Sequence, residues 1–452
     1  MTFVTELRDY LSGDPCTALI HLGNIEVEQF WGKSVGALAL PSLTAPSARW
    51  LVNRMDQLAL FLAEPQDYVL LKEPLDPEYA AYLRGEGFQL PHVLFPKTNR
   101  PELNITENFL ADEEGLQALK GLNAALMPFG VSHLEEELSQ KTGLSLCGPA
   151  SAIVEAVNSK ILSRQLNESL GIRAIPGSCC SSLEELKEAL RRHQNVLDEG
   201  GKLVVKDAFG VSGKGLSVVT SPEKSASLLK MWERQLNAKP GGVIRVVVEK
   251  WIDKKCDINY QFLIAKDGRV GFCGVRDAVT ENGVHQGHRI PTSLNLSQVE
   301  ELEQTAKVLG PALYRQGYFG MVGVDAILST DNVVYPNLEI NARFNMSTYQ
   351  NKIAEDVLPG RSALAKHFAF KLERAWSFKE LEQVLGPYIY RRAEGTGFLI
   401  NDFATLNAAK ACGGAHWPGR LYGLVIERSE QEVQVLNQKL TEVLGALERN
   451  VT

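Results

Sequence analysis

Glu339-Ile340-Asn341-Ala342-Arg343, which follows Gly323-Val324-Asp325 along the chain, is the most specific pattern in this sequence. Alternate side chains of a β-strand share a face, so Glu339 and Asn341 are expected to point the same way. The turn-like Thr330-Asp331-Asn332 separates the two segments. If they pair as a hairpin, the oxygen-bearing side chains of Asp325, Glu339 and Asn341 converge, as Mg²⁺ bound to the phosphates of a nucleotide requires. Arg343, next on that face, supplies a planar cation for a phosphate or a carboxylate.

The composition indicates a folded protein of several domains. A length of 452 residues suggests about three domains, and 44% hydrophobic with 22% charged residues is typical of a globular protein. The net charge of −7 argues against nucleic acid as the main partner, so an anionic ligand must be held by local clusters of Lys and Arg. No apolar run approaches the ~18 residues of a membrane helix, so no membrane partner is expected.

The seven cysteines indicate a reducing compartment. Their number is odd, they form no C-x-x-C pair, and no secretory leader precedes them. We therefore expect a cytoplasmic protein without structural disulfides. The adjacent Cys179 and Cys180 have no visible basic partner, which favours a structural role over a redox role.

The order of expected elements predicts three regions with an overall α/β fold. Short apolar runs alternate with helix-like segments over residues 1–145, as in a small α/β domain with a parallel sheet. Residues 146–358 combine helices with β-rich blocks, and residues 359–452 resemble a small α+β cap. The helices expected in the second and third regions cover 151–170, 297–316 with a kink or restart at Pro311, 363–374 and the segment from 431 to about 448.

A glycine-rich loop joins two predicted strands, 202–207 and 216–220. It reads Ala208-Phe209-Gly210-Val211-Ser212-Gly213-Lys214-Gly215. Glycines allow backbone N–H groups to approach phosphate oxygens, but the strand that follows excludes a Walker A loop, and a plain hairpin turn is the alternative. Lys206, at the end of an apolar strand beside this loop, favours phosphate binding.

Taken together, these motifs resemble the ATP-grasp ligases over residues 151–350. The resemblance rests on the order of two lysines, the glycine-rich loop, Val248-Glu249-Lys250-Trp251, Arg276 and the Asp325…Glu339-x-Asn341-x-Arg343 pattern. It implies an N-terminal Rossmann-like domain (1–145), a core of two α+β subdomains (about 150–240 and 241–358 within 146–358) and a C-terminal α+β domain (359–452). The placement of the first domain is similar to the pre-ATP-grasp domain of pheganomycin-type peptide ligases and of the butirosin carrier-protein:glutamate ligase.

The resemblance also implies roles for single residues around ATP and Mg²⁺ or Mn²⁺. Lys160 and Lys206 would contact phosphates, and Lys250 and Ile252 would hold the adenine through their backbone groups. Glu249 would meet the adenine amine or a ribose hydroxyl, and Asp257, shorter than the usual Glu, would meet ribose. The alternatives are a solvated helix lysine for Lys160 and a charged turn around Asp257.

Further residues are expected on the side of the substrate. By the resemblance, Arg276 would act with Arg343 and Asn341 in stabilising the transferred phosphoryl group, although Arg276 could instead form a surface ion pair.

A polar loop over 277–291 is expected to cover the substrate. It carries His285, His288 and Arg289 between Gly283 and Gly287, and either histidine could accept a proton. The His-x-x-His spacing has no evident third zinc ligand, which favours a metal-free loop. Ser347 is a candidate donor to the acceptor substrate, with a simple turn as the alternative.

Four functions are compatible with this pattern. The leading hypothesis is a ligase that activates the carboxylate of an amino acid or peptide as an acyl-phosphate and joins it to an amine. Ligation to the thiol of a carrier protein is the second, a small-molecule kinase the third, and a nucleotide-binding regulator without turnover the fourth. The three intact oxygen ligands argue against the last, and the family resemblance allows a homodimer.

Overall fold

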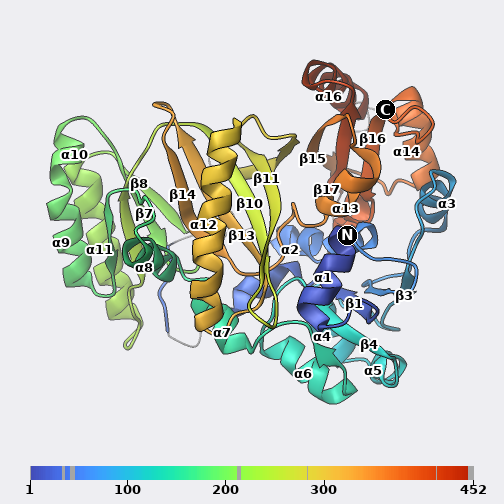
Figure 1. The fold of residues 1–452 in the computed structure, drawn as a ribbon, viewed down its shortest axis with the longest axis horizontal. Helices are drawn as coiled ribbons and strands as arrows, with labels where there is room; N and C mark the ends of the chain where they lie inside the picture. The colour runs from blue at the N-terminus through green and yellow to red at the C-terminus, as the bar shows by residue number, and fades with distance from the viewer. Residues whose placement is uncertain are drawn as a thin grey trace.

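The computed structural model describes residues 2–32, 36–40, 46–210, 215–281, 284–413 and 415–445. These residues form three β-sheets with helices around them, as Figure 1 shows. The architecture confirms the α/β class expected from the sequence. Among the described residues, no helix is long and apolar enough to cross a membrane.

The N-terminal region contains a five-stranded parallel sheet in the order β3-β2-β1-β4-β5. Leu19, Ile20 and Leu126 have no exposed surface, because parallel strands are covered on both faces. The parallel sheet predicted from the alternating apolar runs is therefore confirmed. Its elements are α1 (Phe3–Ser12), β1 (Ala18–Leu22), η1 (Ile25–Phe30), α2 (Pro46–Val52), η2 (Met55–Phe61), β2 (Tyr68–Leu70), α3 (Pro77–Gly85), β3 (His92–Leu94), α4 (Ile105–Leu110), α5 (Glu113–Leu119), β4 (Ala124–Pro128), α6 (His133–Thr142) and β5 (Ser145–Leu146).

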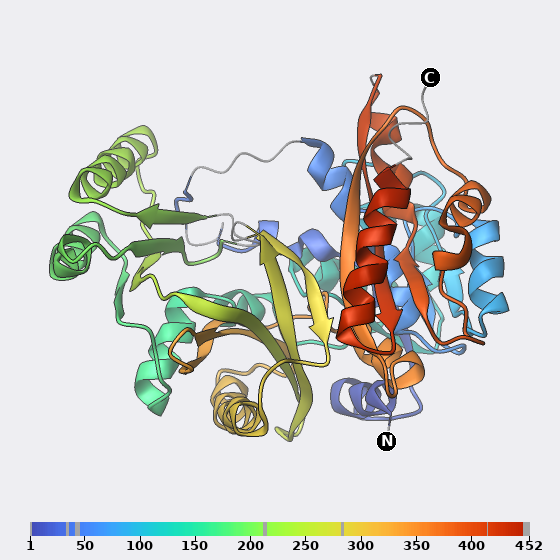
Figure 2. The same cartoon turned by 90° about the horizontal axis from the view of Figure 1, so that it is seen from above.

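A second unit, here called the small lobe, projects at one end of the molecule in Figures 1 and 2. It is an antiparallel sheet in the order β6-β9-β7-β8 with helices on one side. The strands predicted on either side of the glycine-rich loop, β7 and β8, pair as expected. The elements are β6 (Gly177–Cys180), α9 (Leu183–Arg192), α10 (Gln194–Asp198), β7 (Leu203–Asp207), β8 (Leu216–Val219), α11 (Pro222–Ala238) and β9 (Val246–Lys250).

The helix expected over 151–170 is divided into α7 (Ser151–Val157) and α8 (Lys160–Leu170). The break lies at Asn158, whose side-chain Oδ1 accepts from the N–H of Ala342 at 2.9 Å and whose Nδ2 donates to its carbonyl at 3.3 Å. This long-range contact positions the start of α8 next to the strand that carries Asn341.

An eight-stranded sheet in the order β14-β13-β10-β11-β12-β15-β17-β16 forms the centre of the molecule. Its pairs are antiparallel, and α12 lies along its first part in Figure 1. The remaining elements are β10 (Lys254–Ile264), β11 (Val270–Glu281), β12 (Val284–Ile290), α12 (Leu296–Arg315), β13 (Gly320–Ser329), β14 (Val334–Asn341), α13 (Gln350–Val357), β15 (Ser362–Leu372), α14 (Phe378–Leu385), η3 (Gly386–Tyr388), β16 (Gly397–Asp402), α15 (Ala404–Asn407), η4 (Ala408–Cys412), β17 (Trp417–Glu427) and α16 (Glu430–Leu444).

Two predictions about this sheet and its helices were wrong. Residues 363–374 lie largely in strand β15 rather than in a helix, because pairing with β12 and β17 outweighs the helix preference of their Ala and Lys residues. The segment 277–291 is mostly the paired strands β11 and β12 rather than a polar loop. The helix expected over 297–316 is confirmed as α12, which continues through Pro311 without a restart, and a kink there stays a prediction.

Candidate active site

The hairpin of β13 and β14 is formed as predicted, with Asp325 opposite Glu339 and Gly323 opposite Asn341. Residues directly opposite in an antiparallel pair share a face. The same row continues through Asn259 on β10 and Arg276 on β11, which are also direct cross-strand partners. One face of the sheet therefore carries a line of polar and charged side chains from Glu339 to Arg276.

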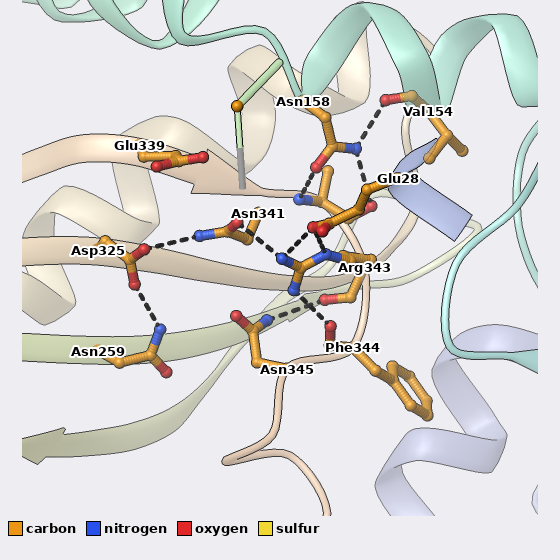
Figure 3. A network of polar contacts seen from close by, with 12 residues as sticks. Glu28, Val154, Asn158, Asn259, Asp325, Glu339, Asn341, Arg343, Phe344 and Asn345 are labelled. Atoms are coloured by element: carbon orange, nitrogen blue, oxygen red, sulfur yellow. Dashed lines mark hydrogen bonds and ion pairs between the residues drawn. The ribbon is translucent and has the colours of Figure 1, made fainter. Parts of the chain in front are cut away.

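Asp325 lies at the centre of this row. Its Oδ1 accepts from Asn259 Nδ2 at 2.9 Å and its Oδ2 from Asn341 Nδ2 at 3.1 Å, as Figure 3 shows. Burial and the charge of Glu339 raise the pKa of Asp325 to about 6, although both hydrogen bonds and Arg343 act in the opposite direction. Both hydrogen-bond partners of Asp325 in this row are neutral amides, so its charged form has a local deficit of positive charge.

A divalent cation fits this deficit. Carboxylate and amide oxygens of Asp325, Glu339 and Asn341 are ligands that Mg²⁺ prefers, and phosphates and water complete its coordination in nucleotide sites. Within the described residues no group of three or more His, Cys, Asp or Glu residues could hold a metal ion alone. An Mg²⁺ at this place would therefore depend on Asn341 and on the nucleotide.

Lys160 connects this hairpin with the glycine-rich loop. At the start of α8, its Nζ lies 2.5 Å from Glu339 Oε1 and 2.5 Å from the carbonyl of Gly210. Its side chain is 9% exposed, and its own N–H donates to the carbonyl of Ala208. Lys160 is therefore not a solvated helix lysine. It lies between Glu339, which is an expected metal ligand, and the glycine-rich loop, which is expected to bind phosphates.

Lys206 and Glu249 form an ion pair inside the small lobe, in which Glu249 is buried and Lys206 is half-buried. Lys206 Nζ lies 2.8 Å from Glu249 Oε2, and Arg164 Nη1 lies 3.2 Å from Oε1 of the same carboxylate. Although burial lowers it, the carboxylates of Glu249, Glu339 and Asp325 together raise the pKa of Lys206 above its usual value. The ammonium group is therefore within the electrostatic reach of both acids of the hairpin.

The glycine-rich loop is described only at its two ends. Asp207 N–H donates to the carbonyl of Gly215 at 2.8 Å and closes the loop at its base, where Gly215 has a φ of +75°. Phe209 is half-buried against the apolar residues beside β9. The candidate residues Ser212, Gly213 and Lys214 lie outside the described residues, so their phosphate contacts stay predictions.

Arg343 is held by a residue that sequence analysis did not identify. Its guanidinium forms an ion pair with Glu28 of η1 and donates to Asn341 Oδ1 at 3.1 Å and to the carbonyl of Phe344 at 2.8 Å (Figure 3). The ring of Phe129 lies 5.1 Å below it. The N-terminal domain therefore contributes a carboxylate to the edge of the site.

Arg276 is buried rather than part of a surface ion pair. It is 6% exposed, its Nη2 donates to Asn351 Oδ1 at 2.5 Å, and burial lowers its pKa to about 10. Ser347, which has no exposed surface, donates to Asn259 Oδ1 at 2.8 Å and accepts from Gln261. The segment after Arg343 is thus joined to the polar row by side-chain hydrogen bonds and is more than a simple turn.

The two histidines of β12 contact each other. His285 Nε2 lies 3.1 Å from His288 Nε2, and His288 Nδ1 lies 3.3 Å from Gln350 Nε2. Burial lowers the pKa of both, and for His288 the charge of Arg276 adds to this effect. Arg289 points to the other face, where it pairs with Glu430, so the structure does not bring it to the site.

The expected adenine-binding segment follows β9. Lys250 is exposed and its N–H is already bonded to the carbonyl of Pro176, whereas Ile252 is half-buried. Asp257 lies on β10 two residues before Asn259 and is held by Lys254 at 2.6 Å and Thr280 at 2.6 Å. These positions are compatible with adenosine contacts, which stay predictions.

Four residues at the site escaped the sequence analysis: Glu28, Arg164, Asn259 and Gln261. Asn259 and Gln261 had a local signal, since two amides in alternation within an apolar strand are unusual on a buried face. Glu28 follows the carboxyl end of β1, the edge where open α/β sheets bind ligands. No sequence pattern distinguished Arg164 from the other polar residues of its predicted helix.

Comparison with known families identifies the class of protein. The model of the pre-ATP-grasp domain matches residues 55–144, and the model of the ATP-grasp domain matches residues 168–345. The chain therefore belongs to the ATP-grasp ligases that carry a pre-ATP-grasp domain, enzymes that use ATP and release ADP.

Two relatives illustrate the proteins to which this chain is similar. A [butirosin acyl-carrier protein]–L-glutamate ligase from Niallia circulans is 26% identical over 89% of this chain and 91% of its own length. A formate-dependent phosphoribosylglycinamide formyltransferase from Bacteroides fragilis is 29% identical over 43% of this chain and 47% of its own. The chain thus matches about half the length of the formyltransferase.

A similar overall fold occurs in an N5-carboxyaminoimidazole ribonucleotide synthetase solved with ADP. The similarity covers 95% of this chain and 97% of the synthetase, with a TM-score of 0.54 and 13% sequence identity. At this identity the likeness concerns the fold.

Proposed function

We propose that this enzyme activates the carboxylate of an amino acid or peptide as an acyl-phosphate and joins it to an amine. The observation that carries the proposal is the convergence of Asp325, Glu339 and Asn341 with Lys160, Lys206 and Arg343 at one edge of the sheet. Paired acids suit a metal–nucleotide complex, and the cations around them suit the negative charge that moves during phosphoryl transfer.

In the first step, a carboxylate oxygen attacks the γ-phosphorus of ATP, the bond to the bridging oxygen breaks, and ADP leaves. In the second step, the amine attacks the acyl carbon, the C–N bond forms, phosphate leaves with its oxygen, and the amine loses a proton. Mg²⁺ bound by Asp325, Glu339 and Asn341 would neutralise charge on the phosphates.

The residues of this chain supply position and charge rather than a nucleophile. Lys160 and Lys206 would hold the phosphates in line, and Arg343 and Arg276 would stabilise the acyl-phosphate. His285 and His288 stay candidate acceptors for the proton of the amine because of their place on β12, whereas the lowered pKa of both makes them weak bases.

A thiol acceptor is the second candidate, and a specific observation favours it. The relative that aligns over nearly the whole chain is a ligase whose name specifies an acyl-carrier protein and L-glutamate. L-Glutamate is therefore the first acid to test, and a carrier protein is the first macromolecular acceptor.

Hydroxylamine trapping tests both candidates. The enzyme is incubated with Mg-ATP, hydroxylamine and single amino acids, and ADP and hydroxamate are measured. A hydroxamate formed with one acid supports acyl-phosphate chemistry, and products with an amine or with a carrier thiol then distinguish the acceptors. ADP release with a phosphorylated product and no hydroxamate would instead assign a kinase, and an Asp325→Asn variant controls for contaminating ATPase.

A further inference from the structure

A short N-terminal segment, Gly36–Leu40, lies against the small lobe instead of the rest of its own domain. It is here called the strap. In Figures 1 and 2 it is a short blue segment next to the green strands of the lobe. The chain reaches it after η1 and is back in the N-terminal domain at α2. The strap therefore links two units that the sequence separates by more than 100 residues.

Backbone hydrogen bonds attach the strap to the residues before β9. Leu38 N–H donates to the carbonyl of Val243 at 2.9 Å, and Val243 N–H donates to the carbonyl of Gly36 at 3.1 Å. These bonds form a parallel bridge between Ala37 and Val243. The strap thus adds a short strand-like edge to the small lobe.

The side chains of the strap belong to the core of the small lobe. Leu38 is 7% and Leu40 is 6% exposed, and both are in the apolar cluster that contains Val205 and Trp232. A Cβ atom at Gly242 would lie 2.7 Å from Leu38 Cδ2, which shows how closely the lobe fits this side chain. Burial of two leucines makes the strap an integral part of the lobe core.

The strap also contacts the base of the glycine-rich loop. Leu40 N–H donates to Asp207 Oδ2 at 2.7 Å, and Asp207 N–H closes the loop through the carbonyl of Gly215. Just before the strap, a Cβ atom at Gly32 would lie 2.9 Å from the ring of Phe209. The N-terminal domain therefore contacts the first described end of the loop, through Asp207 and Phe209.

We propose that the strap is a positioning element for the ATP phosphates: Leu38 and Leu40 fix the small lobe, and the Leu40–Asp207 hydrogen bond fixes the base of the glycine-rich loop. This inference rests on nucleotide binding by that loop and not on the identity of the acid or the acceptor. Because the two described ends of the loop, Asp207 and Gly215, already lie together, this part of the ordering cost of phosphate binding does not have to be met when the nucleotide binds.

Calorimetric titration of the full-length protein with MgADP and with adenosine tests the proposal. Replacing both Leu38 and Leu40 by Ala is expected to weaken MgADP binding on the order of tenfold, because a misplaced loop loses phosphate contacts. Adenosine affinity is expected to stay unchanged, since adenosine has no phosphate. Leu296→Ala, at a leucine that is 74% exposed, is the matched control and should bind both ligands normally.

A second pair of variants isolates the polar contact if the double variant fails to fold. Asp207→Ala removes the acceptor for Leu40 N–H and should weaken MgADP binding, whereas Asp207→Asn keeps a carbonyl oxygen and should restore it. Unchanged MgADP affinity in the folded variants, or an equal loss for adenosine, overturns the proposal. Failure of the wild-type protein to bind MgADP would overturn the nucleotide site itself, which separates that result from a failure of the strap alone.

Discussion

Replacing Asp325 by Asn should stabilise the metal-free protein and abolish its response to a metal–nucleotide complex. In the fold, burial and Glu339 raise the pKa of Asp325 from 3.8 to about 6. Because the folded-state pKa is raised, the stability contributed by the protonated carboxyl is complete below pH 3.8 and is lost as the pH rises through about 6. Above that pH the wild-type protein carries an unfavourable charge that Asn lacks.

The expected gain in stability follows from the difference between the folded-state and unfolded-state pKa of Asp325. A shift of about 2 pKa units corresponds to about 3 kcal/mol at 1.36 kcal/mol per unit. Asn keeps one acceptor oxygen but cannot accept from both Asn259 and Asn341, which removes about 1 kcal/mol of hydrogen bonding. The variant should therefore gain about 2 kcal/mol at pH 8, or a few degrees in the melting temperature; at about pH 4 and below the gain disappears and only the loss of about 1 kcal/mol of hydrogen bonding remains.

Thermal unfolding from pH 4 to pH 8 in EDTA, then with MgADP, measures both effects. The wild-type protein should be stabilised by MgADP at pH 8, and the Asn variant should not. Asp356→Asn, on the exposed part of α13, controls for the loss of a carboxylate and should retain the MgADP effect. A variant less stable than the wild type at pH 8, or one that still responds to MgADP, would refute the reasoning.

Three further substitutions test other contacts. Lys160→Met should lower kcat/KM for ATP by about two orders of magnitude, because the ammonium that bridges Glu339 and the loop is lost; an unchanged value in steady-state kinetics would contradict this role. Glu249→Leu should destabilise the protein by about 3 kcal/mol in urea unfolding, because the buried Arg164 and the half-buried Lys206 both lose their carboxylate partner; unchanged stability would show that the pair is solvated. Gly287→Ala should reduce folded yield strongly, since its Cβ would lie 1.8 Å from a carbonyl of β15; a soluble variant with a native melting temperature would show that β12 and β15 can separate.

The fold class of the N-terminal domain could be predicted from the sequence, but its contribution to the site could not. Its short apolar runs indicated a parallel sheet because strands that are covered on both faces read as continuous apolar segments that alternate with helices. Glu28 and the strap belong to the site only through contacts with residues far along the chain. No local sequence pattern indicates such a contact, because the packing of distant elements against each other determines which residues meet.

The C-terminal region shows the same limit. Residues 363–374 carry Ala and Lys residues that favour a helix, yet every residue from Ser362 to Leu372 pairs with β17. Hydrogen bonding of β15 to the edges of β12 and β17 outweighs a helix preference of a few tenths of a kcal/mol per residue. As a result, the expected cap continues the central sheet.

The sequence by itself determined the hairpin of β13 and β14, because alternation along a strand and a three-residue turn are local properties. Asn332 in that turn adopts a φ of +64°, a conformation that Asn tolerates. Tertiary structure alone decided that Lys160 reaches Glu339, that Glu28 pairs with Arg343 and that Leu40 supports Asp207. The physical reason is that these contacts join separate elements, whose relative position depends on the burial of whole faces rather than on the residues around each group.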